Sequence, residues 1–215
     1  MTSVIQPALA SLFPAAGVPV GGQRLYNFSA GPGVLPDEVL RQIQHDVWNI
    51  FHSGVGILEH SHRGPVYDRV LAEAEADFRA IGNVPANYKV LFMTGGATSQ
   101  NFIAPMNLKS YHDTADYITT GYWAERSLEH GAGFGSVHEA FAGKANNYSR
   151  IPDDAEIRYS AKPSYVHFCS NNTIYGTQWH EKDAQGRSTW AQRVPKVPAV
   201  GSGGGSGGDV PVVCD

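Results

Sequence analysis

The sequence predicts an α/β protein in which a mostly parallel β-sheet is flanked by helices. Short apolar runs of strand type alternate with longer segments whose apolar residues follow helical spacing. Glycines and small polar residues follow several of the strand-type runs, which indicates turns at the strand ends. Strands that alternate with helices form parallel sheets covered on both faces, and ligands of such folds bind at the carboxyl ends of the strands.

Two amphipathic helices are expected in the first third of the chain. The first begins near Pro36, with Asp37 and Glu38 beside the positive end of its dipole. Its apolar face comprises Val39, Leu40, Ile43, Val47 and Ile50. The second follows SHRGP and ends at Gly82, a residue type that favours helix C-caps. Its apolar face comprises Val66, Val70, Leu71, Ala74, Phe78 and Ile81.

The alternation of strands and helices continues to the end of the chain. YKVLFM, residues 88–93, is expected to be a buried strand, and TSQNFIAPMNL a helix that Pro105 distorts or shortens. The segment YWAERSLEHGA is expected to be a helix that ends at glycine. Further strands are expected at ADYITTG, GSVHEAF, SYVHFCS and DVPVVCD.

Composition excludes several classes of protein. A chain of 215 residues with a net charge of −4 gives no electrostatic reason to expect nucleic acid or an anionic membrane as a partner. No apolar stretch is long enough to span a bilayer. Cys169 and Cys214 lack the spacing of a metal site, so reduced thiols and a cytoplasmic location are expected.

Two segments differ from the rest in composition. Residues 1–24 contain one arginine and no acidic residue, and they match neither a transit peptide nor a secretory signal, so a flexible leader is expected. Residues 201–209, GSGGGSGGD, are of low complexity. A natural loop insertion is favoured over an engineered linker because a strand-type run follows it. Residues 25–215 are then expected to form the folded domain.

The turn GGATSQ has the properties of an anion site. Its glycines let the backbone approach a ligand, and the helix that follows presents free N–H groups and a dipole suited to phosphate. A plain turn capped by Thr98 or Ser99 is an equally good interpretation of this stretch alone. The spacing is neither that of a Walker motif nor GxGxxG, so ATP and NAD are poorly supported.

The loop LEHSHRGP concentrates charged and imidazole side chains. His60 and His62 point to one side of an extended segment, but no third ligand of suitable spacing follows, so a metal site is disfavoured. Arg63 beside His62 suits a carboxylate or phosphate ligand. A solvated charged loop is the alternative.

Three further candidates follow strand-type runs. Trp123 could stack on an aromatic ligand or pack into the core. The polar run that ends in Thr173 could bind a ligand or shape a turn. Asp215, at the end of an apolar strand, could hold a protonated ring nitrogen.

Taken in order, these motifs closely resemble those of the phosphoserine aminotransferases. The matching segments are YNFSAGPGVLP, EHSHRG, ANYKVLFMTGGATSQNFIAPMNL, ADYITTGYWAERS, SYVHFCSNNTIYGTQW and VPVVCD. That family belongs to the class V group of the fold type I enzymes that use pyridoxal 5'-phosphate (PLP). The resemblance implies the PLP-binding large domain of the family, ending before the catalytic lysine and the small C-terminal domain.

The resemblance also implies a role for each candidate. The backbone of Ala97 and Thr98 would hold the cofactor phosphate, with Thr98 standing where the family commonly has an arginine. Trp123 would stack on the pyridine ring, and Thr173 would hydrogen-bond the cofactor near its ring oxygen or phosphate. Asp215 would pair with the pyridine nitrogen and keep the ring protonated.

The implied reaction is reversible amino transfer between O-phospho-L-serine and 2-oxoglutarate in serine biosynthesis, with pyridoxine biosynthesis as a second use. His62 and Arg63 would bind the acidic substrate, and such contacts can cross the interface of a homodimer. In the family a lysine holds PLP as a Schiff base and moves the proton. The six lysines here do not match its loop, so no catalytic residue is assigned and inactivity of this chain is expected. Another class V enzyme and a non-catalytic PLP-binding or dimerisation fragment are the alternatives.

Overall fold

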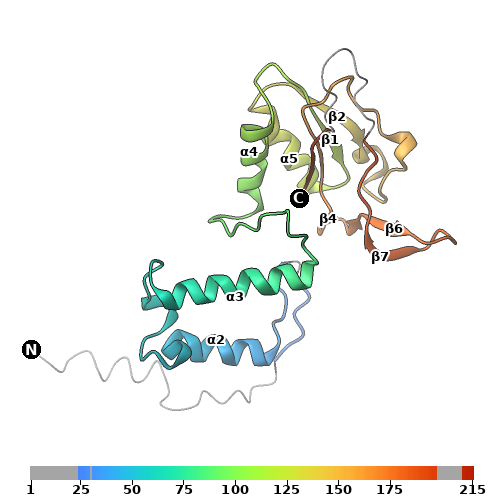
Figure 1. Ribbon diagram of the computed structural model, residues 1–215. Coiled ribbons are helices and arrows are strands. Elements are labelled where there is room, and N and C mark those ends of the chain that lie inside the picture. The colour runs from blue at the N-terminus through green and yellow to red at the C-terminus, as the bar shows by residue number, and fades with distance from the viewer. Residues whose placement is uncertain (1–23, 30, 198–209) are drawn as a thin grey trace, which may run out of the picture. The chain divides into compact units, whose positions relative to one another are not determined.

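A computed structural model describes residues 24–29, 31–197 and 210–215 (Figure 1). The predicted leader, apart from Arg24, and the glycine- and serine-rich run at 201–209 lie outside the described residues. By its internal contacts the chain divides into two units, residues 1–67 and 68–215, with the boundary inside helix α3. The extent of a single domain over residues 25–215 stays a prediction.

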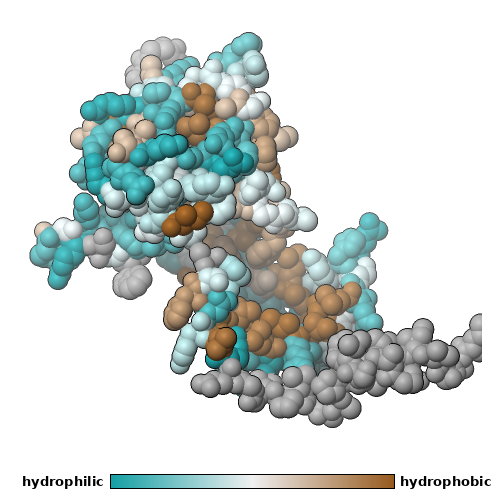
Figure 2. Space-filling model, turned by 180° about the vertical axis from the view of Figure 1, so that it is seen from behind, coloured by the Kyte–Doolittle hydropathy of each residue, from teal (hydrophilic) through white to brown (hydrophobic). Residues whose placement is uncertain are grey.

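The first unit contains helix α2 (Asp37–Asn49), two short 3₁₀ helices, η1 (Ile50–His52) and η2 (Ile57–Glu59), and the start of α3 (Pro65–Gly82). Asp37 and Glu38 occupy the first turn of α2, as its sequence predicts. Among the described residues of this unit, Ile50 is the only hydrophobic residue that is buried, at 4% exposed. The other four residues of the predicted apolar face of α2 are 38–48% exposed. Apolar side chains accordingly gather on the surface of the helical segment, in the lower part of Figure 2.

The second unit is built on a four-stranded parallel sheet of order β2-β1-β3-β8. Its strands are β1 (Ala115–Thr119), β2 (Val137–Ala142), β3 (Val166–Phe168) and β8 (Val212–Cys214), at four of the predicted positions. Every residue of β1 is buried, because this central strand is covered on both faces. The sheet brings the ends of β1, β3 and β8 to one edge.

Helix α5 (Tyr122–Ala132) begins directly after β1 and covers one face of the sheet, where Leu128 packs against a cluster containing Tyr117 and Tyr165. Gly131 is required there because a Cβ at this position would collide with the Tyr117 hydroxyl. Helix α4 (Ala97–Leu108) packs against α5. The core of the opposite face comprises Ile118, Ala140, Ile157, Val166, Phe168 and Trp179.

Short elements complete this unit. Two antiparallel pairs form between β4 (Asn171–Asn172) and β5 (Thr177–Gln178), and between β6 (His180–Lys182) and β7 (Ser188–Gln192). The 3₁₀ helices η3 (Gly143–Asn146) and η4 (Asp154–Glu156) lie between β2 and β3 in the sequence. None of these short elements was expected from apolar periodicity, since each is mainly polar.

One expectation about local structure is wrong, and another is wrong in part. YKVLFM forms no strand, and Leu91, Phe92 and Met93 are 76%, 54% and 56% exposed. The run has the composition of a buried strand, but no described segment pairs with its backbone, and a strand exists only when a neighbour does so. Pro105 does not shorten α4, which continues to Leu108 with the proline buried, and a distortion of the helix at Pro105 stays a prediction.

Candidate functional site

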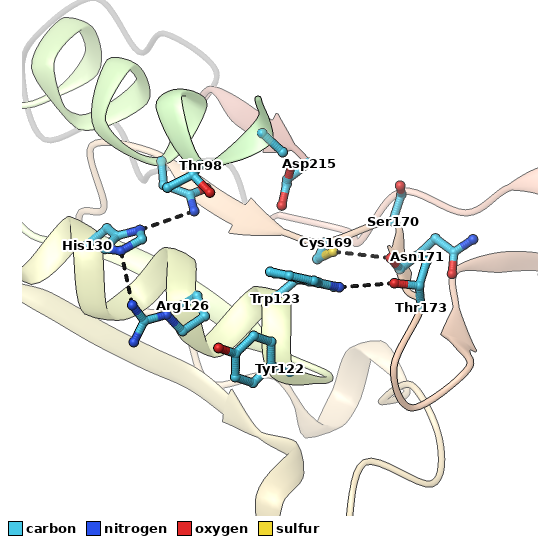
Figure 3. A pocket seen from close by; sticks show the side chains of 12 residues that line it. Thr98, Tyr122, Trp123, Arg126, His130, Cys169, Ser170, Asn171, Thr173 and Asp215 are labelled. Atoms are coloured by element: carbon cyan, nitrogen blue, oxygen red, sulfur yellow. Dashed lines mark hydrogen bonds between the residues drawn. The ribbon is translucent and has the colours of Figure 1, made fainter. Parts of the chain in front are cut away.

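A cavity of about 600 Å³ opens in the second unit at the edge where β1, β3 and β8 end (Figure 3). Five residues singled out in the sequence line it: Ala97, Thr98, Trp123, Thr173 and Asp215. They come from segments that are far apart in the chain, and the parallel sheet brings them together. Their roles toward a cofactor stay predictions.

The first turn of α4 forms one wall of the cavity. The helix begins at Ala97, so the first N–H groups of α4, those of Ala97 and Thr98 included, have no partner within the helix. Gly95 precedes it with φ +106°, and a Cβ there would overlap the Ser99 hydroxyl, so the turn needs glycine. Free N–H groups at the positive end of a twelve-residue helix suit an anion such as phosphate.

The first turn of α5 places Trp123 in the middle of the lining residues (Figure 3). The residue is 40% exposed and lines the cavity, so part of its ring surface is open toward the cavity. The indole Nε1 donates a hydrogen bond to Thr173 Oγ1 at 3.0 Å. The Tyr122 ring meets the indole edge-on at 5.0 Å between centroids. Trp123 is thus held in place without being buried in the core.

Asn172 fixes the turn after β3 to the start of α5. Its side chain is fully buried, and its Oδ1 accepts a hydrogen bond from the Ala124 N–H at 3.2 Å. Its Nδ2 donates to Thr120 Oγ1 at 3.0 Å, and Thr177 Oγ1 donates to the Thr120 carbonyl at 2.6 Å. This network sets the separation between Trp123 and Thr173.

Asp215 follows β8 and faces the cavity beside Cys169 (Figure 3). Burial raises the pKa of the Asp215 carboxyl, and a hydrogen bond from the Cys169 thiol partly offsets that rise. Burial and the nearby Asp215 charge raise the pKa of the Cys169 thiol to about 12, so the thiol is protonated at neutral pH. That proton has two acceptors within reach, Asp215 and the Asn171 carbonyl at 3.6 Å.

Sequence reasoning missed the polar side of the cavity that α5 provides. Arg126 and His130 line the cavity together with Asn101 of α4. The sequence does contain a signal for these two residues. Arg126 and His130 come three and seven positions after Trp123, so the three side chains lie on the same face of the helix. Cys169 and Ser170 also line the cavity, and their position directly after β3 could have identified them.

His62 and Arg63 lie in the first unit, on the exposed turn before α3. Ser61 shapes this turn, since its Oγ accepts a hydrogen bond from the Arg63 N–H at 3.2 Å and its carbonyl accepts one from Gly64 N–H at 3.0 Å. The cavity lies in the second unit. Substrate binding by His62 and Arg63 stays a prediction.

The cavity residues fit PLP by the chemistry of their donors. Free helix N–H groups match a phosphate, an open indole face matches a pyridine ring, and a partly buried carboxylate matches a protonated ring nitrogen. In the described part of the chain, no group of three or more His, Cys, Asp or Glu residues could hold a metal ion. Across the same residues, no helix is long and apolar enough to cross a membrane.

The chain is similar to known proteins over most of its length. A curated phosphoserine aminotransferase from Herpetosiphon aurantiacus is 43% identical over 155 residues, which cover 72% of this chain and 43% of the relative. A solved phosphoserine aminotransferase structure from Bacillus circulans subsp. alkalophilus has 37% identity and a TM-score of 0.70, over 89% of this chain and 47% of that one. A structure described as PLP-bound phosphoserine aminotransferase from Trichomonas vaginalis has 28% identity and a TM-score of 0.73, with the same coverage.

The chain spans less than half the length of these relatives. The aminotransferase class-V family matches residues 25–187, which include the turn GGATSQ, Trp123 and Thr173. The similarity therefore covers the segments that build most of the cavity. The chain belongs to the aminotransferase class-V family.

Proposed function

We propose that this chain supplies the PLP-binding part of a phosphoserine aminotransferase, which transfers an amino group between O-phospho-L-serine and 2-oxoglutarate. The observation that carries the proposal is the convergence of Ala97, Thr98, Trp123, Thr173 and Asp215 on one cavity. The curated relatives and solved structures named phosphoserine aminotransferase support the substrate. Serine biosynthesis is the corresponding pathway, with pyridoxine biosynthesis as a second use.

The protein's own residues would each do one task. Ala97 and Thr98 would bind the phosphate through backbone N–H groups, and Trp123 would orient the ring by stacking on it. Thr173 would hold the indole and contribute its hydroxyl. Asp215 would accept a hydrogen bond from the ring nitrogen and keep a proton on that atom. When bound, PLP would supply the electron sink for breaking bonds at the substrate's α-carbon.

Proton transfer at the substrate carbon needs a general base, usually a lysine in this family. The described residues include all six lysines of the chain, and none of them lines the cavity: Lys89, Lys109, Lys144, Lys162, Lys182 and Lys196. We therefore propose that PLP binds here without a covalent bond and that this chain alone does not catalyse transamination.

The experiment mixes the purified chain with PLP, treats it with borohydride and analyses it by mass spectrometry. Reversible binding seen by absorbance, with no stoichiometric adduct and no turnover of phosphoserine, is the expected result. A stoichiometric adduct on one lysine together with turnover would show that the proposed absence of a catalytic lysine is wrong. Failure to bind PLP at all would contradict the proposed function itself.

The assembly and the substrate contacts are further parts of the proposal. His62 and Arg63 would bind the acidic substrate, and a homodimer in the cytoplasm would be the complete form. A non-catalytic PLP-binding or dimerisation module is the second candidate, favoured by the lysine-free lining of the cavity. Detection of amino transfer after the chain is extended to the length of its relatives would exclude this candidate.

A further inference from the structure

The charges that line the cavity are few and asymmetric. Arg126 is the single lysine or arginine among the described lining residues, and Asp215 is the single carboxylate. Figure 3 shows Arg126 and His130 on the Thr98 side of the cavity, away from Ser170, Asn171 and Thr173. A ligand that carries an anion near Thr98 and a proton near Asp215 would match both charges.

A network of side chains holds Arg126 along this wall. Arg126 Nη2 donates a hydrogen bond to His130 Nε2 at 3.5 Å. Because a guanidinium only donates, Nε2 must accept, which places the imidazole proton on Nδ1. That atom faces the Asn101 amide at 3.3 Å, and a half-turn of the amide presents its oxygen. Arg126 therefore carries the permanent positive charge of this wall.

The network is anchored at both ends to helices that form the cavity. Ser127 Oγ is 2.8 Å from the amide group of Asn101, and it donates to the Trp123 carbonyl at 3.1 Å. The Phe102 ring stacks on His130 at 4.7 Å between centroids. The side chain of His130 is therefore fixed by packing and by hydrogen bonds, which limits the positions that Arg126 can occupy.

One neighbour competes for the guanidinium. Arg126 Nη1 also pairs with Glu129, three residues later on the same helix. Both side chains are exposed, at 42% and 55%, and an exposed pair of this spacing is weak. A phosphate dianion carries more charge than a carboxylate and accepts two parallel N–H bonds from arginine. A bound phosphate would therefore displace Glu129.

We propose that Arg126, held by His130, is a phosphate-binding residue of this cavity and contacts the dianion of a phosphate monoester. The inference rests on the proposed function for the identity of that ester, which is either the cofactor or the phosphorylated amino acid. Thr98 offers only neutral donors at the first turn of α4, so Arg126 supplies the cationic donor on that side of the cavity.

The experiment uses the full chain and four variants. Arg126→Gln removes the charge, Arg126→Lys keeps the charge without the fork, and Glu129→Gln removes the competitor. Arg150→Gln is the matched control, because Arg150 forms an exposed pair with Glu156 outside the cavity. Circular dichroism verifies that each variant is folded.

Dissociation constants are measured for PLP and for pyridoxal, which lacks the phosphate, through quenching of tryptophan fluorescence. Binding of phosphoserine and serine is measured by calorimetry, and that of inorganic phosphate by ³¹P NMR. Arg126→Gln should weaken binding of the phosphate ligand that Arg126 contacts by about tenfold or more, as expected for a charge-assisted hydrogen bond. Arg126→Lys should weaken binding of this ligand less than Arg126→Gln does. Glu129→Gln should raise the affinity for the same ligand a few-fold, and Arg150→Gln should leave that affinity unchanged.

The results separate the two sources of phosphate. Weaker PLP binding with unchanged pyridoxal binding assigns Arg126 to the cofactor, and weaker phosphoserine binding with unchanged serine binding assigns it to the substrate. Equal losses for PLP and pyridoxal, or no loss for any phosphate ligand, would overturn the inference. If the chain binds no PLP but binds inorganic phosphate in an Arg126-dependent way, the proposed function fails and the inference stands.

Discussion

The indole N–H of Trp123 donates a hydrogen bond to the Thr173 hydroxyl at 3.0 Å, across 50 positions of sequence. The bond connects the first turn of α5 with the turn that follows β3. It fixes the rotation of the indole about its side-chain bonds while one face of the ring stays open. A flat ligand would therefore meet a stacking surface that is already oriented.

Trp123→Ala should weaken PLP binding by about 1–2 kcal/mol, the scale of one aromatic contact with its lost burial. The measurement is the PLP dissociation constant from absorbance titration. Trp48→Ala is the control, because Trp48 is 85% exposed in the first unit. Unchanged PLP affinity of the Trp123 variant would remove this residue from the site.

Thr173→Val should weaken PLP binding about three- to tenfold, which corresponds to one hydrogen bond of about 1 kcal/mol. The valine keeps the shape of the side chain and removes the acceptor of the indole N–H. Thr173→Ser retains the hydroxyl and should bind PLP like the parent chain. If Thr173→Ser and Thr173→Val weaken PLP binding equally, the hydroxyl group does not contribute to PLP binding at this position.

Asn172→Ala should lower the free energy of unfolding by about 1–3 kcal/mol, since the buried Ala124 N–H would lose the partner that Asn172 provides. Chemical denaturation gives the value. Asn171→Ala is the adjacent control, because the Asn171 side chain is exposed and should change stability by less than about 0.5 kcal/mol. A larger loss at Asn171 than at Asn172 would contradict the assigned network.

The stability of the second unit should fall as the pH drops from about 6.5 toward 4. His167 is 3% exposed, and burial lowers its pKa to about 4. The unfolded chain, with an ordinary histidine pKa near 6.5, therefore binds more protons than the folded chain across this window. The neutral histidine contributes its full stability above pH 6.5, and that contribution is lost on acidification, amounting to roughly 3 kcal/mol.

Unfolding curves measured between pH 4 and 7 would provide the check. His167→Gln should show a flatter dependence on pH, while His112→Gln should keep the parent slope because His112 is exposed. An unchanged slope in the His167 variant would mean that other groups cause the acid sensitivity.

Arg63→Lys, in a chain extended to the length of its relatives, should raise the apparent KM for the acidic substrates and leave PLP binding intact. Lysine keeps the charge but cannot form the two parallel bonds that a guanidinium makes with a carboxylate or phosphate. Steady-state kinetics and a PLP titration measure the two effects separately. Loss of PLP affinity with an unchanged KM would show that Arg63 serves the cofactor instead.

The sequence predicted the alternation of strands and helices in the second unit well, because β1 and α5 have unmistakable apolar patterns and clear end signals. Trp123, Thr173 and Asp215 line the cavity because each directly follows or lies close to the end of a strand, while their roles toward a cofactor stay predictions. Residues at such positions meet at one edge of a parallel sheet whatever the details of packing.

The errors have a common physical origin. A run such as YKVLFM reports how apolar a segment is, whereas strand formation depends on a neighbouring backbone that composition cannot specify. The side of the cavity formed by Arg126 and His130 was not predicted, for a related reason. Its chemistry emerges only when α4 packs against α5 and brings Asn101 next to His130.

Strand β8 is three residues long and pairs with β3 at positions 46 apart, as in Val166 with Val212. Strand β8 pairs with β3 alone among the described strands, whereas β1 pairs with a strand on each side, so β8 is held less firmly than β1. The wall that carries Asp215 should therefore be the last to order and the first to open. A ligand that contacts Asp215 would bind only the closed form, so added PLP should raise the melting temperature and slow hydrogen exchange most in β8. Cofactor supply would then govern how long the assembled cavity persists.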